Sequence, residues 1–514
     1  MNLQKNQPAK MPLNLLVALL GILISAIMSG LNSRVGSLGL AEVRGTWGLA
    51  MDAASWLSTS YTVGELIAMP FATWFAITLS VRRFHFYMVM CSAAIALLLP
   101  FIQDLNLMIA LRFIQGVSSG ALIPILMMMA LKTLPPSIRL HGLALYALTA
   151  TFAPNLAIWL TGYWTDSLHD WRLIYWQIIP MCLISLILVG MTLPKEKIIT
   201  ARFKQGNWFG MGFGMSSLIL IGISLSQGVR LDWFNSPLIC ISLGSGFAFL
   251  GVYLISEWYH PTPFIKLQLL SRRNLWVGSI IFMALLTILL SGSLLPSSYL
   301  GMIQGFKAQQ IAPIGLYIAL PQLILGSVVA IFLYQKWVDA RVVLCLGLTL
   351  IAVACFLSAQ LTGQWHVQQF ITATLLQALG QSMTVVPLLF LMTSVVEPME
   401  GPYFSGTINA LRVLGTLFGS AVVGQILVAR GHYHSQMLLD KAMQNENLQA
   451  IQVINIDHII AEQAHILSVA DTYRLLGCFA IGVIFLVWRM LYIPAPSPQI
   501  EPTANNLQSK PLHG

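Results

Sequence analysis

Charged residues are scarce in this chain: Lys, Arg, Asp and Glu together make up 9% of its 514 residues. A soluble globular protein carries about a quarter charged residues, so this chain lacks the polar groups to cover a surface that faces water. Hydrophobic residues reach 57% instead. Apolar runs of about 20 residues, long enough to cross a bilayer as a helix, recur along the whole sequence. The composition therefore excludes an ordinary soluble protein and predicts an all-α integral membrane protein.

Several chemical motifs are also missing. All six cysteines lie inside apolar runs, so they predict no disulfide framework. No glycine-rich phosphate-binding loop is present, which argues against ATP hydrolysis as the energy source. Nucleophile motifs and metal-ligand spacings are absent as well, and the pair His432 and His434 is weak evidence for a metal. We therefore expect no enzyme activity, no metal and no cofactor.

Apolar runs between charged or Pro/Gly-rich breaks predict about fourteen transmembrane helices. They lie near residues 13–33, 54–77, 84–103, 106–131, 140–163, 172–193, 207–227, 236–257, 274–300, 311–334, 341–360, 368–393, 403–430 and 472–493. An even number of spans places both termini on the same side of the membrane.

The basic residues predict which side that is, because Lys and Arg concentrate in cytoplasmic loops. With cytoplasmic termini, the inner segments hold 17 Lys and Arg and the outer segments hold eight, while Arg112 and Arg412 lie inside spans. The inner loop 394–402 departs from this bias, since it carries two acids and no base. The net charge of +9 is thus explained by topology, and we expect no nucleic-acid partner.

A weak internal repeat suggests how the spans are grouped. Gln115, Gly116 and Pro124 in the fourth span match the pattern of residues 377–387 in the twelfth. Two homologous six-helix halves around a central cavity are a known transporter plan. We expect a first half at 13–193, two inserted helices with their loops at 194–273, a second half at 274–493 and a cytoplasmic tail at 494–514.

The outer segment 431–471 is the one long loop. Its apolar residues recur at three- and four-residue spacing, which predicts an amphipathic helical hairpin lying on the outer surface. A poorly ordered, solvated loop is an equally good interpretation.

Three segments carry a family resemblance. The segments are LMIALRFIQGVSSGALIP, HDWRLIYWQIIP with Trp171, Arg172 and Pro180, and NALRVLGTLFGSAVVG. They resemble sequences of the major facilitator superfamily. The specific likeness is to its fourteen-span drug:proton antiporters of the EmrB type. Three departures stand out. Asn32 occupies the place of an acid that the family usually has in helix one, and the loop after helix two keeps only the basic pair Arg82 and Arg83 of its motif. Only Pro154 and Gly162 remain of the family's fifth-helix antiporter motif.

The resemblance implies a major facilitator fold with a 6+2+6 arrangement of helices. It also implies multidrug efflux: proton-coupled export of small amphipathic or toxic compounds, including antibiotics, across a bacterial cytoplasmic membrane. Such exporters commonly work with a periplasmic adaptor and an outer-membrane channel, for which segment 431–471 is a candidate docking surface. Two alternatives remain, a proton-coupled importer or symporter of a small metabolite and a non-transporting membrane scaffold or sensor.

Glu65 is the acid that lies deepest in a predicted span. A charge at bilayer depth costs about 2.5–3.5 kcal/mol on insertion scales and usually has a function, so we interpret Glu65 as the proton carrier. A structural carboxyl that holds a neighbouring helix is the alternative. Arg112 in the fourth span is its expected partner in proton coupling, although an arginine that braces helix packing is a comparable interpretation.

Other polar residues inside spans are candidates for the wall of a substrate cavity. They are Ser25, Ser29, Asn32, Ser58, Tyr61, Thr62, Gln115 and Arg412, with Arg34 at the outer mouth. Several of them serve equally well to hold helices together. Arg412 has no obvious acid nearby and is able to meet an anionic group of a substrate. Six further residues are expected in helix packing or gating: Gly116, Gly120, Pro154, Gly162, Gly415 and Gly419.

Overall fold

The computed structural model describes residues 12–444 and 456–495. Over these residues the chain is helical or irregular without any β-strand, and 14 helical segments are long and apolar enough to cross a membrane. The prediction of an all-α protein with fourteen spans is therefore confirmed.

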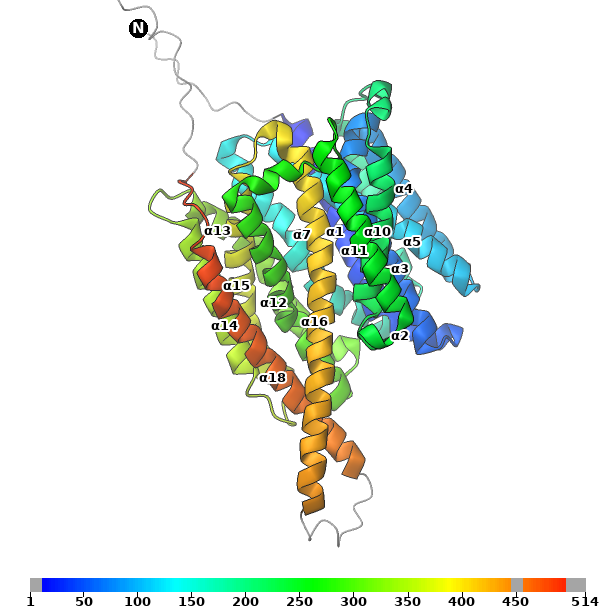
Figure 1. Cartoon of the computed structure of the whole chain (residues 1–514), viewed down its shortest axis with the longest axis vertical. Helices are drawn as coiled ribbons and strands as arrows, with labels where there is room; N and C mark the ends of the chain where they lie inside the picture. Colours follow the sequence, from blue (N-terminus) through cyan, green and yellow to red (C-terminus); the bar gives the residue numbers. More distant parts are fainter. Residues whose placement is uncertain (1–11, 445–455, 496–514) are drawn as a thin grey trace, which may run out of the picture.

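The spans fall into three groups along the chain (Figure 1). The first group is α1 (Leu13–Leu38), α3 (Met51–Leu79), α4 (Val81–Leu98), α5 (Leu105–Gly120) continued by α6 (Leu122–Thr133), α7 (Pro136–Gly162) and α9 (Ile178–Thr192). The second is α10 (Trp208–Gln227) and α11 (Pro237–Tyr259). The third is α12 (Arg273–Ile303), α13 (Ala308–Leu333), α14 (Ala340–Ser358), α15 (Val367–Thr393), α16 (Gly401–Gln444) and α18 (Ile456–Val487).

Short helices extend the ends of some spans or lie in the connections between spans. They are α2 (Leu40–Trp47), α8 (Leu173–Trp176), the 3-10 helices at Leu99–Phe101, Thr200–Lys204, Trp233–Asn235, Leu267–Ser271 and Pro398–Glu400, and a π-helical turn at Tyr163–Ser167. Acidic caps mark where some spans begin: Asp104 accepts a hydrogen bond from the backbone N–H of Asn106 at 3.2 Å. Between such ends the helical backbone satisfies its own hydrogen bonds, as lipid requires.

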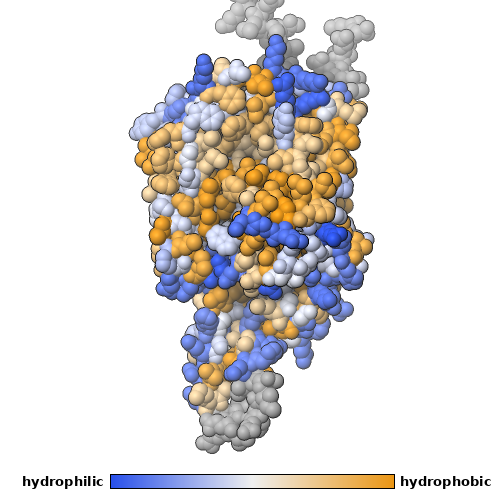
Figure 2. All heavy atoms as spheres, turned by 90° about the vertical axis from the view of Figure 1, so that its right-hand side faces the viewer, coloured by the Kyte–Doolittle hydropathy of each residue, from blue (hydrophilic) through white to orange (hydrophobic). Residues whose placement is uncertain are grey.

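The surface has the layering expected for a protein in a bilayer. On the face that Figure 2 shows, hydrophobic residues cover much of the middle of the body, and hydrophilic residues gather above and below them. The described ends of the chain, near residues 12 and 495, lie on one side of the bundle, which we call the terminal side (Figure 1).

The two six-helix halves meet along two helix pairs. Helix α7 packs against α13 and helix α3 packs against α16, while α10 contacts both α3 and α16. The α7–α13 contact is very close: a Cβ atom added at Gly315 would lie 2.3 Å from the carbonyl oxygen of Asn155. Small residues at such crossings let backbones approach where lipid gives no hydrophobic drive for association.

On the terminal side, hydrogen bonds close the space between the halves. Thr73 of α3 donates to the carbonyl of Pro402 at 2.9 Å, and Ser405 of α16 donates to the carbonyl of Pro124 at 2.6 Å. Deeper in the bundle, the hydroxyl of Tyr146 donates to Asn409 Oδ1 at 2.8 Å. The halves are therefore sealed against each other at this side.

The segment 431–471 differs from the prediction of a hairpin lying on the outer surface. Residues 431–444 continue α16, residues 456–471 belong to α18, and both project from the body away from the terminal side (Figure 1). At 1.5 Å per residue, the 44-residue α16 is about 66 Å long, about twice the thickness of the hydrocarbon core, so part of it must leave the membrane. Residues 445–455 between the two helices lie outside the described residues.

Asp471 joins the two helices where this projection begins. Its carboxylate accepts hydrogen bonds from Arg430 Nε at 2.8 Å, His434 Nε2 at 2.8 Å and Arg474 Nη1 at 3.0 Å. Charge-assisted bonds of this kind are the stronger ones in proteins. The histidine pair considered as a weak metal signal thus contributes His434 to an ion network, and among the described residues no cluster of metal-ligating side chains occurs.

Candidate functional site

A cavity of about 420 Å³ lies between the two halves. Its walls come from α1, α3, α7, α10, α12, α15 and α16. The lining residues on α1, α3 and α16 extend from Arg412 and Glu65 toward Ser37 and Gly424, away from the closed terminal side. The cavity therefore faces the side from which α16 and α18 project.

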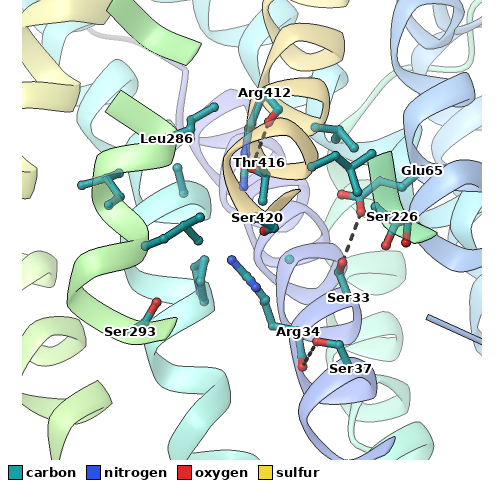
Figure 3. A pocket seen from close by; sticks show the side chains of 18 of the residues that line it. Ser33, Arg34, Ser37, Glu65, Ser226, Leu286, Ser293, Arg412, Thr416 and Ser420 are labelled. Carbon is teal, nitrogen blue, oxygen red and sulfur yellow. Dashed lines mark hydrogen bonds between the residues drawn. The ribbon is translucent and has the colours of Figure 1, made fainter. Parts of the chain in front are cut away.

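Three charged residues line this cavity: Arg34 of α1, Glu65 of α3 and Arg412 of α16 (Figure 3). Glu65 is only 7% exposed, and its Oε2 accepts a hydrogen bond from Ser33 Oγ at 3.2 Å. The charges of Arg412 and Arg34 both act on its carboxylate. An acid is thus held at the cavity wall beside two cations, in surroundings where electrostatic interactions are stronger than in water.

Arg412 is bound across the interface between the halves. Its Nη1 donates to Thr149 Oγ1 at 2.6 Å, and its Nη2 donates to the carbonyl oxygen of the same residue on α7. A guanidinium group has five N–H donors, so donors remain for a ligand. No acid pairs with Arg412 in an ion pair among the described residues, and a hydroxyl and a carbonyl take that place.

Arg34 is different, because its guanidinium group donates no hydrogen bond to any residue that the structure describes. Figure 3 shows its side chain reaching into the space between the helices, below Ser420. An arginine with its donors free in a cavity is suited to bind a carboxylate or a phosphate in bidentate geometry.

The polar face of α1 predicted to line the cavity is not the face that lines it. Ser25, Ser29 and Asn32 do not line it, whereas Ser33 and Arg34 do. One residue along a helix corresponds to a rotation of about 100°, so this small shift in sequence turns the predicted face toward neighbouring helices.

The residues turned away from the cavity make contacts between helices. Ser29 donates to the carbonyl of Ser119 at 2.8 Å, and Asn32 Nδ2 donates to the hydroxyl of Tyr61 at 3.2 Å. Ser25 donates to the carbonyl of Ile22 in α1 and lies 3.1 Å from His85 Nε2 of α4, and neither Tyr61 nor Gln115 is part of the cavity wall. Ser58 and Thr62 do lie in that wall, one to two turns from Glu65 on α3.

Arg112 does not pair with Glu65, in contrast to the expected partnership. Its Nη1 donates to Gln115 Oε1 at 2.7 Å, and its guanidinium carbon lies 4.4 Å from the centre of the Tyr61 ring and 5.5 Å from that of Tyr175. Tyr61 precedes Glu65 by one turn, about 6 Å along α3, and therefore meets the arginine first. A cation–π contact satisfies Arg112 where an ion pair was expected.

The predicted packing residues lie at close helix crossings. A Cβ atom added at Gly116 would lie 2.1 Å from the carbonyl oxygen of Tyr61, and one at Gly120 would lie 2.7 Å from Cα of Glu65. These glycines let α5 approach α3 and so fix the backbone that carries Glu65. Gly162 meets Gln309 of α13, Gly415 and Gly419 both meet α12, and Pro154 lines the cavity.

The structure adds cavity residues that the sequence did not indicate. Thr149 and Asn155 contribute polar groups from α7. Ser226 of α10 and Val229 of the turn between α10 and α11 also contribute to the wall. A serine near the end of an apolar run carries no signal of its own. The inserted helix α10 is thus part of the cavity rather than a peripheral addition.

Two six-helix halves around a cavity that is closed on one side are the plan of a membrane transporter. The sequence matches the family described as Major Facilitator Superfamily over residues 19–325, more than half of the chain. The chain belongs to this superfamily and is a multi-pass membrane protein.

Known relatives agree with the EmrB-type resemblance. The chain is 22% identical to the multidrug export protein EmrB of Escherichia coli (strain K12) over 440 residues, 85% of each chain. It is 24% identical to the fatty acid resistance protein FarB of Neisseria gonorrhoeae over 427 residues, 80% of each chain. The crystal structure of the human organic anion transporter MFSD10 has the same fold, with a TM-score of 0.58 at 14% identity over 94% of this chain and 100% of that one.

Proposed function

We propose that this protein exports small amphipathic or toxic organic compounds across the bacterial cytoplasmic membrane in exchange for protons. The relatives named for multidrug export and fatty acid resistance support export. The excess of basic residues on the terminal side supports cytoplasmic termini, so that the cavity described above faces outward. The proton gradient is the proposed energy source, and no cofactor takes part.

The observation that carries this proposal is the position of Glu65 in the cavity wall. An intramembrane carboxyl that faces a cavity is available both to protons and to a substrate. When it is ionised, it offers an acceptor to a cationic or hydrogen-bond-donating group of the substrate. When it is protonated, its negative charge is lost, the interaction with that group weakens and the substrate is released. Proton and substrate then compete for one site, which is the requirement for antiport.

The apolar part of a substrate has a separate surface. Leu286, Leu289 and Leu290 of α12 and Leu417 of α16 line the cavity opposite the polar residues of α1 and α3. A ligand site of this kind takes most of its affinity from apolar contact and its orientation from a few polar groups. An amphipathic compound fits both walls at once.

Transport assays on proteoliposomes with an imposed proton gradient test the proposal. We expect the wild type to move ethidium, a cationic amphipath, against its concentration gradient and Glu65→Gln to lose this proton-driven transport. Glu42→Gln, at an exposed position on α2, is the matched control and should transport normally. Full gradient-driven transport by a correctly folded Glu65→Gln protein would overturn the role of Glu65.

The two arginines support a second candidate, proton-coupled symport of an anionic compound. An anion that binds Arg34 or Arg412 neutralises a positive charge that acts on the ionised Glu65 carboxylate. Its binding therefore favours protonation of that carboxyl. Proton and anion then bind together, which is symport coupling. Binding measurements across pH separate the two: acidification weakens substrate binding in an antiporter and strengthens it in a symporter. A protein that moves neither protons nor probe would instead be a scaffold or sensor.

We further propose that the projecting parts of α16 and α18 dock a periplasmic adaptor, which connects the exporter to an outer-membrane channel. Their protrusion on the side opposite the termini supports this role (Figure 1). Co-purification from the native membrane tests it. An adaptor should be recovered with the full chain and lost when residues 431–471 are replaced by a short linker, and equal recovery with both would contradict the docking role.

A further inference from the structure

A second cavity, of about 240 Å³, opens between α4 and α9 close to the terminal side. Three basic side chains line it, from Arg82, Arg83 and Lys195, and no acid does. Arg82 and Arg83 are the second and third residues of α4, and Lys195 follows the end of α9 by three residues. The cations are therefore at the end of the spans, at the level where lipid headgroups carry their phosphates.

These cations have charge available for a ligand. None of the three is in an ion pair with a residue that the structure describes. Arg82 Nη1 donates to the carbonyl of Leu193 at 2.8 Å, which orients its guanidinium group beside the end of α9 and leaves its other donors. The cavity is thus a positively charged site without an internal counter-ion.

His85 is a further lining residue of the same cavity. The side chain is fully buried, and its Nε2 lies 3.1 Å from Ser25 Oγ and 3.2 Å from Ser185 Oγ. Each hydroxyl gives its one hydrogen to a backbone carbonyl, that of Ile22 for Ser25 and that of Gly21 for Ser185. Both hydroxyls therefore act as acceptors toward the ring, and Nε2 carries the hydrogen.

The other ring nitrogen of His85, Nδ1, then accepts no hydrogen bond from the described residues. With the hydrogen on Nε2, the neutral ring presents Nδ1 as an acceptor. This atom is buried and has no hydrogen-bond partner among the described residues. An unpaired buried acceptor is energetically unfavourable, so a ligand that brings a donor to it is favoured.

The surroundings of the cavity are apolar and face outward from the bundle. Phe86, Leu186 and Val189 contribute to its wall, and Ile187 and Met191 of α9 are exposed on the same helix. In a bilayer such residues contact acyl chains. A ligand with a polar head in the cavity and hydrocarbon along α4 and α9 would satisfy both surfaces.

We propose that this cavity binds an anionic phospholipid whose headgroup carries free hydroxyl groups, as that of phosphatidylglycerol does, in the leaflet on the terminal side. The phosphate lies among Arg82, Arg83 and Lys195, and a headgroup hydroxyl donates to His85 Nδ1. A zwitterionic headgroup also brings a donor, but its ammonium group is repelled by the three cations. The site is separate from the cavity between the halves and does not depend on the proposed transport function.

Native mass spectrometry of the full-length protein, extracted in mild detergent, tests the proposal with equimolar phosphatidylglycerol, phosphatidylethanolamine and phosphatidic acid of the same acyl chains. The wild type should retain phosphatidylglycerol in preference to phosphatidylethanolamine. Arg83→Gln combined with Lys195→Gln should weaken binding of both anionic lipids by roughly fivefold per charge removed. His85→Leu should lower the ratio of phosphatidylglycerol to phosphatidic acid that is bound.

Lys197→Gln is the matched control, since Lys197 lies in the same loop and is exposed but does not line the cavity. It should retain lipid like the wild type. An equal loss with Lys197→Gln, or no preference for phosphatidylglycerol in the wild type, would overturn the proposal. Displacement of the lipid by millimolar sn-glycerol 3-phosphate would also overturn it, because the site would then bind free phosphate esters. Should His85→Leu fail to fold, the Arg83 and Lys195 variants still decide the outcome.

Discussion

Glu65 of α3 and Arg412 of α16 face one cavity from opposite halves of the protein, and each is held by a hydroxyl of another helix. Ser33 of α1 donates to Glu65, and Thr149 of α7 accepts from Arg412. The Arg412 bond joins the two halves, whereas the Glu65 bond lies within one half. A change of charge on Glu65 is therefore felt by a residue whose contacts depend on how the halves are placed.

Arg34→Gln should weaken binding of an anionic probe without destabilising the protein. The Arg34 guanidinium group donates no hydrogen bond within the described structure, so its loss breaks none, although it also removes a positive charge that acts on Glu65. Bonds to charged groups contribute about 1.5–3 kcal/mol, which corresponds to an affinity loss of about tenfold or more. Titration with a fluorescent fatty acid and thermal melting measure the two effects. Arg44→Gln, on α2 outside the cavity, should change neither, and unchanged affinity in Arg34→Gln would refute a ligand contact.

Arg412→Gln should behave differently and lower both binding and melting temperature. It removes a donor to the anion and also the hydrogen bonds to Thr149 that connect α16 with α7. If only binding fell, the bond across the halves would contribute nothing to stability, contrary to this expectation.

Gly116→Ala should destabilise the protein by about 1–3 kcal/mol or more, because overpacked sites force backbone shifts. The added methyl group would lie 2.1 Å from the carbonyl oxygen of Tyr61, and a backbone atom cannot rotate away. Thermal unfolding in detergent measures the change. Gly190→Ala is the control, since an added Cβ there meets no atom within 4 Å. Equal melting of both variants would show that α3 and α5 are less tightly packed than described.

Ser226→Phe should narrow the range of transported compounds. Ser226 of α10 lies in the cavity wall, so a phenyl ring there takes up part of the cavity. Bulky probes should lose transport more than small ones, in a panel measured with equal amounts of protein in the membrane. Ser216→Phe, on an exposed face of the same helix, should leave the range unchanged. The same range in Ser226→Phe would exclude α10 from the substrate path.

Asp471→Asn should loosen the pair α16 and α18 where they leave the body. The substitution removes the charge that holds Arg430 and His434, at a cost of about 1.5–3 kcal/mol. Faster limited proteolysis of the projecting segment is the expected readout. Asp457→Asn, at an exposed position of α18, should be cut at the wild-type rate. No change in Asp471→Asn would show that packing alone joins the helices.

Hydropathy predicted the spans well because lipid imposes a strict requirement on every spanning segment. The same requirement does not determine which face of a helix points toward the cavity. Helix α1 carries polar residues on two faces. Ser29 and Asn32 bond to neighbouring helices, whereas Ser33 and Arg34 line the cavity, and the sequence pattern fits either face as the cavity wall. The choice between the two faces depends on neighbours that are distant in sequence.

The sequence also did not reveal which residues contact the buried charges. An acid was expected beside Arg112, and an aromatic ring and an amide satisfy it instead. Arg412 likewise bonds to a threonine, a residue type too common to be noticed. The position of Glu65 was easier to foresee, because a lone acid in an apolar run is conspicuous whatever surrounds it.

Helix α16 runs without interruption from the sealed contacts around Ser405, past Arg412 in the cavity, to the segment beyond the membrane. A straight helix transmits tilt along its length, so opening of the terminal side would swing the far end through a wider arc than the cavity itself. A partner bound to that end would therefore be displaced when the transporter opens toward the terminal side. The projecting end is in this sense mechanically coupled to the cavity.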